Sequence, residues 1–132
     1  MIKTIDVAVS GQGLYDISVP VASAIAIEEG LCTLFIRHTS ASLLIQENYD
    51  ASVKLDLERW LNKLVSENDS DYTHLTEGPD DMPAHIKSAL TSTSLSIPVM
   101  GRSLMLGTWQ GIFLWEHRHQ KGRRKVIIHM ND

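Results

Sequence analysis

The chain has 132 residues, of which 43% are hydrophobic and 21% are charged. This length and balance are typical of one globular domain with its own core, so we expect a single domain over residues 1–132. The formal net charge of −4 argues against nucleic acid as the main partner, because phosphate backbones are usually bound by a basic surface.

The first ten residues, MIKTIDVAVS, contain no long apolar run after a basic start, so no signal peptide is predicted. Every apolar stretch is far shorter than the ~20 residues that a membrane helix needs. The single cysteine, Cys32, excludes an internal disulfide and lies in the apolar run LCTLFI, which favours a buried small hydrophobic residue. We therefore expect a cytoplasmic protein with no membrane partner.

The N-terminal region begins with apolar and polar residues in alternation over residues 1–10, which predicts a strand. Gly11 and Gly13 indicate a turn, and residues 14–19 predict a second strand, so we expect a hairpin here. Pro20 suits the first position of a short helix, and Gly30 suits its end.

The middle of the chain begins with a predicted buried strand at residues 31–38 and a second strand at 43–48. A helix is predicted over residues 50–65, where Asp50 can act as the N-cap. Its apolar positions form one stripe, which we interpret as core packing and not as a partner surface. The stripe contains Val53, Leu57, Trp60, Leu61 and Leu64.

Residues 67–81 form a polar segment with six carboxylates, after which Pro83 predicts the start of another helix. Short strands are expected at 95–99 and 104–106, with Pro98 indicating an edge strand and Gly101-Arg102 a turn. Residues 107–119 and 125–130 then predict two strands joined by a hairpin tip, QKGRR. Runs of strands with two or three helices between them predict an α+β fold with a mostly antiparallel sheet.

Polar groups gather in four segments at the ends of predicted elements, where scaffolds usually place functional sites. These segments are residues 37–42, 46–50, 74–85 and 107–119. In the last of them, the two-residue period of a strand assigns Ile112 and Leu114 to the inward face, together with Glu116 and Arg118. Such a glutamate and arginine can hold each other or bind an anion. His117 falls on the opposite, aromatic face.

The segment HLTEGPDDMPAHIK contains two histidines and a glutamate, His74, Glu77 and His85, whose spacing allows them to converge. The spacing matches no standard zinc signature such as HExxH. A metal site and a surface or structural role therefore both stay open. Asp81 has a simpler explanation, because a carboxylate next to the start of a helix interacts favourably with its dipole.

His38, Thr39 and Ser40 follow the predicted buried strand. No GxSxG elbow surrounds this serine, which argues against serine hydrolase chemistry. Anion binding through the hydroxyls, the backbone N–H groups and the imidazole is more plausible than hydrolase chemistry for this segment. We interpret the basic residues near the C-terminus as a solvated hairpin tip, and they are Lys121, Arg123 and Arg124.

Together, RHTSASLLIQEN, HLTEGPDDMPAHIK and GTWQGIFLWEHR resemble the YjbQ-like family of small bacterial and archaeal proteins. The resemblance runs from about residue 30 to the C-terminus. It implies a sandwich-like antiparallel α+β fold and a homotrimer. It also implies a secondary thiamine-phosphate synthase activity, which joins a hydroxymethylpyrimidine pyrophosphate to a thiazole phosphate and releases pyrophosphate.

This resemblance and the clustering of polar residues lead us to assign expected roles. The expected catalytic residues are His38, His85, Glu116 and His117. The expected residues for binding a small phosphorylated substrate are Thr39, Ser40, Asn48, Asp50, Gln110 and Arg118. The expected ligands of a divalent ion, magnesium or zinc, are His74, Glu77, Asp80, Asp81 and His85.

Two alternatives to an enzyme stay open. The same residues would serve a non-catalytic module that binds a small phosphorylated metabolite or a metal ion. A trimeric adaptor is the third hypothesis, with the acidic segment 67–81 as its contact surface. It is the least favoured, because an adaptor has no need for histidine, glutamate and arginine at the ends of buried strands.

Overall fold

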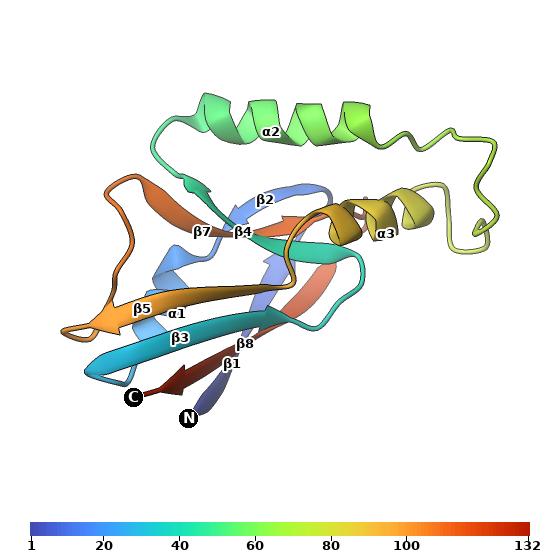
Figure 1. Ribbon diagram of the computed structural model, residues 1–132. Coiled ribbons are helices and arrows are strands. Elements are labelled where there is room, and N and C mark those ends of the chain that lie inside the picture. Colours follow the sequence, from blue (N-terminus) through green and yellow to red (C-terminus); the bar gives the residue numbers. More distant parts are fainter.

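The computed structural model describes residues 1–132 and has eight strands and three helices (Figure 1). This confirms the expected α+β class. In chain order the elements are β1 (Ile2–Val9), β2 (Gly13–Asp16), α1 (Ser18–Ala24), β3 (Glu29–Ile36), β4 (Ala41–Glu47), α2 (Ala51–Leu64), α3 (Asp81–Leu90), β5 (Ser94–Met100), β6 (Ser103–Leu104), β7 (Gln110–Glu116) and β8 (Gly122–Asn131).

The strands form two antiparallel sheets, one in the order β1-β8-β3-β5-β6 and one in the order β2-β7-β4. Consecutive strands alternate between the two sheets. The exception is β5 and β6, which are neighbours in the larger sheet. The two expected hairpins, β1 with β2 and β7 with β8, are therefore wrong. The β5–β6 turn is confirmed, since Gly101 and Arg102 both have positive φ, at 61° and 62°, as a two-residue hairpin turn of the primed type requires.

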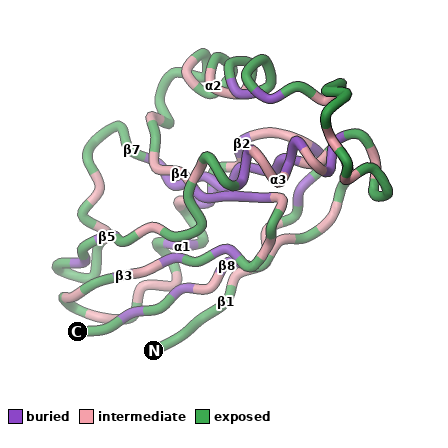
Figure 2. Tube along the Cα trace, turned by 45° about the vertical axis from the view of Figure 1, so that its right-hand side comes forward, coloured by how far each residue is buried: buried purple, intermediate pink, exposed green.

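The main core lies between the two sheets. Inward side chains of the larger sheet, such as Leu34 and Ile128, pack against Leu43, Ile112 and Leu114 of the smaller sheet. Cys32 is fully buried among them, as expected. Figure 2 shows buried residues concentrated on β4, β7 and the adjacent strands, and a mostly exposed α2.

A smaller apolar cluster joins the outer face of β7 to α2 through Leu61, Phe113 and Trp115. Figure 1 shows α2 lying across the three-stranded sheet, on the side away from the larger one. The predicted division of β7 into two faces is confirmed, since Ile112 and Leu114 enter the main core whereas Phe113 and Trp115 enter this second cluster.

The predicted helix at 50–65 is confirmed as α2, and Asp50 caps it by accepting a 2.9 Å hydrogen bond from the backbone N–H of Ser52. The interpretation of its whole stripe as core is wrong. Only Leu61 of the stripe is buried, while Trp60 and Leu64 are 60% and 56% exposed. They line an open groove beside β4 and not a packed core.

The other two helices differ from the expected boundaries. The first ends at Ala24, and Gly30 lies in β3, where a φ of +147° and the carbonyl oxygen of Asn131 leave no room for a Cβ. The last begins at Asp81, two residues before Pro83, because the first turn of a helix tolerates a residue without an N–H. No helix of the structure is both long and apolar enough to cross a membrane.

Candidate functional site

Arg118, just after β7, ties that strand to the beginning of α3. Its guanidinium donates to Oδ1 of Asp81 at 2.6 Å, to Oδ2 of Asp80 at 3.0 Å and to the backbone carbonyl of Glu77 at 2.8 Å. The Arg118 side chain is only 12% exposed and that of Asp81 only 3%. Of the two possibilities left open for Glu116 and Arg118, mutual side-chain pairing does not occur, because the Arg118 guanidinium is held by the acidic segment before and at the start of α3.

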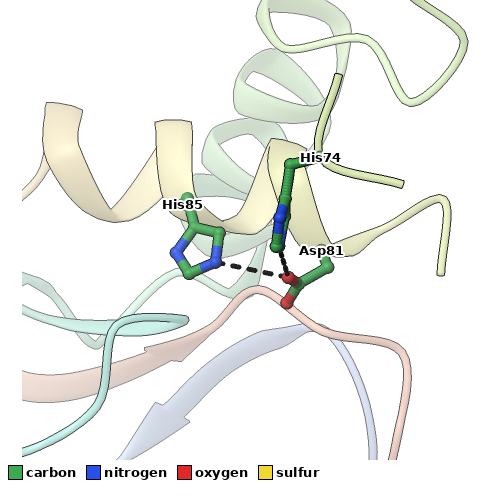
Figure 3. Close-up of side chains that lie close together, drawn as sticks. All are labelled: His74, Asp81 and His85. Atoms are coloured by element: carbon green, nitrogen blue, oxygen red, sulfur yellow. Dashed lines mark hydrogen bonds and ion pairs between the residues drawn. The ribbon is translucent and has the colours of Figure 1, made fainter. Parts of the chain in front are cut away.

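Asp81 also contacts two histidines through its other carboxylate oxygen (Figure 3). Its Oδ2 lies 2.6 Å from Nε2 of His74 and 3.3 Å from Nε2 of His85. Asp81 and His85 are four residues apart, so one face of α3 presents both, and the polar connection before α3 brings His74 over them. We call these three donor groups the His-Asp-His cluster. The spacing of His74, Glu77 and His85 allowed convergence, and the two histidines do meet, with Asp81 in place of Glu77.

The electrostatics of this cluster favour an ionised Asp81. Burial alone would raise the pKa of its carboxyl group. The hydrogen bond from His74 and the positive charges of Arg118 and His85 outweigh burial and hold that pKa below its usual value. The pKa of Asp80 is lowered in the same way, by Arg118 and the backbone N–H of His119 against the effect of burial.

The cluster has a donor set that suits a metal ion. Its three ligand atoms all lie within 4.8 Å of one another. Zinc bound to nitrogen and oxygen at about 2.0–2.1 Å in a tetrahedron keeps its ligand atoms roughly 3.4 Å apart, so small side-chain shifts would fit the ion. Glu77 and Asp80 do not belong to this group of ligand atoms. The Asp80 carboxylate is instead bound by Arg118.

His85 also borders a shallow depression of about 320 Å³ beside the cluster. His38, Thr39, Ser88 and Thr93 line the same depression. Nε2 of His38 accepts a 3.1 Å hydrogen bond from the backbone N–H of Lys125, which leaves its Nδ1 available. Burial and the nearby charge of Arg124 lower the pKa of His38. The structure thus brings together His38 and His85 from separate segments.

Glu116 and His117, two expected catalytic residues, lie in the interior. Glu116 is fully buried and accepts hydrogen bonds from the Arg124 guanidinium at 2.6 and 3.3 Å. This ion pair shows that the interpretation of Arg124 as part of a solvated tip is wrong. Nε2 of His117 lies 2.9 Å from Oγ of Ser42, while the backbone N–H of His117 donates to the carbonyl of Ser40. Burial lowers the pKa of His117 to about 3, and the charge of Lys87 acts in the same direction.

Three expected substrate-binding residues lie at the opposite end of the small sheet. In the antiparallel ladder of β4 and β7, Gln110 lies opposite Glu47 and Glu116 lies opposite Ala41. These two strand positions are six residues apart. At about 3.3 Å per residue, the two ends are roughly 20 Å apart. There Asp50 caps α2, Asn48 donates its backbone N–H to Trp109, and Gln110 accepts from Gly107. Within one chain, these residues do not reach the His-Asp-His cluster.

Sequence reasoning missed Ser42, Lys87 and Ser88. Ser42 follows the expected HTS segment and is the buried partner of His117. Lys87 is only 2% exposed, although it reads as an ordinary basic residue in the last turn of a helix. The α-helical period offered one usable signal, because Ser88 lies three residues after His85 and seven after Asp81, on the same face of α3.

Comparisons with known proteins show the family of the chain. A model of the family described as UPF0047 protein YjbQ-like matches residues 3–132. The chain belongs to this family. A UPF0047 protein of Synechocystis sp. is 49% identical over 95% of this chain and 87% of its own length. The YjbQ protein of Escherichia coli O157:H7 is 40% identical over 95% of this chain and 93% of its own length.

A solved structure extends the comparison to the fold. The crystal structure of a conserved hypothetical protein from Thermus thermophilus superimposes with a TM-score of 0.90 at 32% identity. The match covers 98% of this chain and 99% of that one. The sandwich of curved antiparallel sheets is therefore the fold of the YjbQ-like family. The family name carries no activity, so function has to be argued from the site.

The buried His117 predicts a pH dependence of stability. Below pH 6.5 the unfolded chain takes up a proton at this imidazole, whereas the folded chain stays neutral there down to about pH 3. Its contribution to stability is therefore fully present above pH 6.5 and is lost as pH falls toward 3, by at most about 1.4 kcal/mol per pH unit. Chemical denaturation of wild type and His117→Gln should give free energies of unfolding that converge as pH falls from about 6 to 4. A constant difference between the two proteins over this range would contradict the assignment.

Proposed function

We propose that this YjbQ-like protein binds one divalent metal ion at His74, Asp81 and His85 and uses the site to hold the phosphate group of a small molecule. The observation that carries the proposal is the approach of both imidazoles to one Asp81 oxygen, at 2.6 and 3.3 Å. Without an ion, two histidines and one buried carboxylate form only a local hydrogen-bonded cluster. With an ion, all three become ligands, and a fourth position stays open for substrate or water.

The donor set favours zinc over magnesium. Two imidazoles and one carboxylate suit zinc, whereas magnesium prefers an octahedral shell of oxygen and water. The second oxygen of Asp81 is already held by Arg118 at 2.6 Å. A bond of this kind fixes the orientation of a ligating carboxylate, as outer-shell contacts commonly do in metal sites.

The depression next to the cluster supplies the groups for the phosphate. His85 belongs to both, and Thr39, Ser88 and His38 add hydroxyl and imidazole groups on the other side. When bound, a zinc ion would supply a positive charge that stabilises negative charge on the phosphate or on a departing pyrophosphate. Because Nε2 of His38 accepts from Lys125, Nδ1 carries the ring proton and is placed to donate a hydrogen bond to the phosphate.

The finer proposal is the reaction implied by the family resemblance. Thiamine phosphate forms when the thiazole nitrogen bonds to the pyrimidine methylene carbon and the bond from that carbon to pyrophosphate breaks. A site with a cation and hydroxyl donors suits the departing pyrophosphate. A non-catalytic module that binds a phosphorylated metabolite is the alternative, and it needs the same residues without turnover.

We also propose that the protein assembles as a homotrimer. The family resemblance implies three copies, and two features support contact between copies. Polar residues expected in one site lie roughly 20 Å apart at the two ends of β4 and β7, so only a neighbouring copy could bring Asn48 or Gln110 to the cluster. In addition, α2 leaves Trp60 and Leu64 more than half exposed, and an interface would cover such side chains.

The first prediction concerns zinc affinity. His85→Ala removes one of three ligands, so it should weaken zinc binding by at least about 100-fold, more than loss of a typical outer-shell contact. Competition with a chromophoric chelator measures this affinity. His119→Ala is the matched control, because His119 contacts only Glu67 through its ring and lies outside the cluster. Equal loss in both variants, or no zinc binding by wild type, would reject the proposed metal site.

The second prediction concerns catalysis. Zinc-loaded wild type should form thiamine phosphate from the pyrimidine pyrophosphate and the thiazole phosphate. His38→Ala should slow this formation by about 100-fold, the lower limit for loss of one hydrogen-bond donor to developing negative charge. Chromatography of the product measures the rate, with His119→Ala as the control. Zinc binding without product formation by wild type would favour the binding module, and equal rates in wild type and His38→Ala would exclude the proposed role of His38.

A further inference from the structure

We propose that a second site, on the other side of α3 from the His-Asp-His cluster, binds a compact oxyanion through the buried ammonium group of Lys87. The site is a pocket of about 230 Å³ lined mostly by polar residues. Its walls come from α2, the start of β2, the end of β7 and α3. It contains none of the three residues of the proposed metal site, so it goes beyond the proposed function.

The central observation is a buried cation with too few partners. Lys87 is 2% exposed, and its Nζ donates one hydrogen bond, to Oδ1 of Asn62 at 2.5 Å. An ammonium group has three N–H donors. Glu67 and Asp80 are near enough to act on its charge, but no carboxylate oxygen lies within the 4.0 Å of an ion pair. Buried charges are normally paired, so this one has room for an anionic partner.

The acidic residues of the pocket do not supply that partner. The Glu116 carboxylate is bound by Arg124 through both of its oxygens. Glu58 uses Oε2 to accept a 2.7 Å hydrogen bond from the backbone N–H of Leu14. That contact fixes α2 over β2. It also accounts for the glycine at position 13, because a Cβ there would lie 2.8 Å from the same Glu58 oxygen. Both carboxylates are therefore occupied in holding the walls of the pocket.

Two further groups in the pocket suit an anion. Arg59 lies on its wall and takes part in no ion pair of the chain. The His117 ring bonds Ser42 through Nε2, and no hydrogen bond occupies its Nδ1. His117 is one of the residues that line the pocket. When the Ser42 hydroxyl donates to Nε2, Nδ1 carries the ring proton and becomes a neutral donor.

These groups specify the ligand chemistry. An ammonium, a guanidinium and a neutral N–H donor belong to residues that line one pocket, and these donor types match the oxygen atoms of a phosphate or carboxylate. A cation is disfavoured by Lys87 and Arg59. An apolar ligand would leave the ammonium without a partner. The ligand is therefore a small metabolite, or part of one, that ends in an oxyanion.

Isothermal titration calorimetry tests the site with two probes, inorganic phosphate and acetate. The protein is first treated with chelator, and chloride keeps the ionic strength constant. We expect saturable binding of at least one probe to wild type and at least about tenfold weaker binding to Lys87→Met, because a hydrogen-bonded ion pair is lost. Saturation by phosphate alone identifies a phosphorylated ligand, and saturation by acetate identifies a carboxylate.

Lys63→Met is the matched control, since Lys63 is an exposed lysine of α2 outside the pocket. The affinity of this variant for the probe should equal that of wild type. Circular dichroism reports whether each variant folds. If Lys87→Met does not fold, Arg59→Gln carries the test, with binding a few-fold weaker. Absence of saturable binding by wild type would overturn the proposal. Unchanged affinity in Lys87→Met would also overturn it, as would unchanged affinity in Arg59→Gln if Lys87→Met does not fold. Because metal is removed, this result is independent of whether zinc binds at the cluster.

Discussion

The carboxylate of Asp81 is the point on which the arrangement of the site depends. One oxygen accepts from Arg118 and the other faces His74 and His85. The pair with Arg118 is almost buried, and removing one partner of such a pair typically costs about 3–5 kcal/mol because the other charge is left unpaired. The same contact that joins α3 to the end of β7 therefore fixes the oxygen offered to the two imidazoles. Structural and chemical roles cannot be separated at this residue.

A second buried ion pair supports the same end of the molecule. Arg124 on β8, in the larger sheet, holds Glu116 at the end of β7, in the smaller sheet. The two sheets are thus fixed to each other by apolar packing in the middle and by charge at this edge. The edge is also where the turn after β3 places His38 and where α3 begins. Polar groups from distant segments can hold fixed positions here because each rests on a rigid strand or helix end.

Sequence patterns predict the fold class, nearly every strand and the capped helix after Asp50. The spacing of His74 and His85 allows them to converge but leaves a surface role also open. Sequence patterns fail where the answer depends on which sheet a strand joins. Period and turn residues identify a strand but not its partner, so the sequence predicts a β7–β8 hairpin with Arg124 in solvent, and the structure shows neither. Burial of Lys87 was equally invisible, because a lysine on a short helix shows its surroundings only when α2 and β7 are in place. The residues at 48, 50 and 110 remain predictions for a site that would need another copy of the chain.

The most direct test of the central claim is X-ray anomalous diffraction at the zinc absorption edge, from crystals of the protein loaded with zinc. The proposed site predicts one strong peak about 2.0–2.1 Å from Nε2 of His74, from Nε2 of His85 and from one oxygen of Asp81. Arg118 should still bind the other Asp81 oxygen. No peak at the cluster, or a peak on other residues only, would contradict the claim that these three side chains form the metal site.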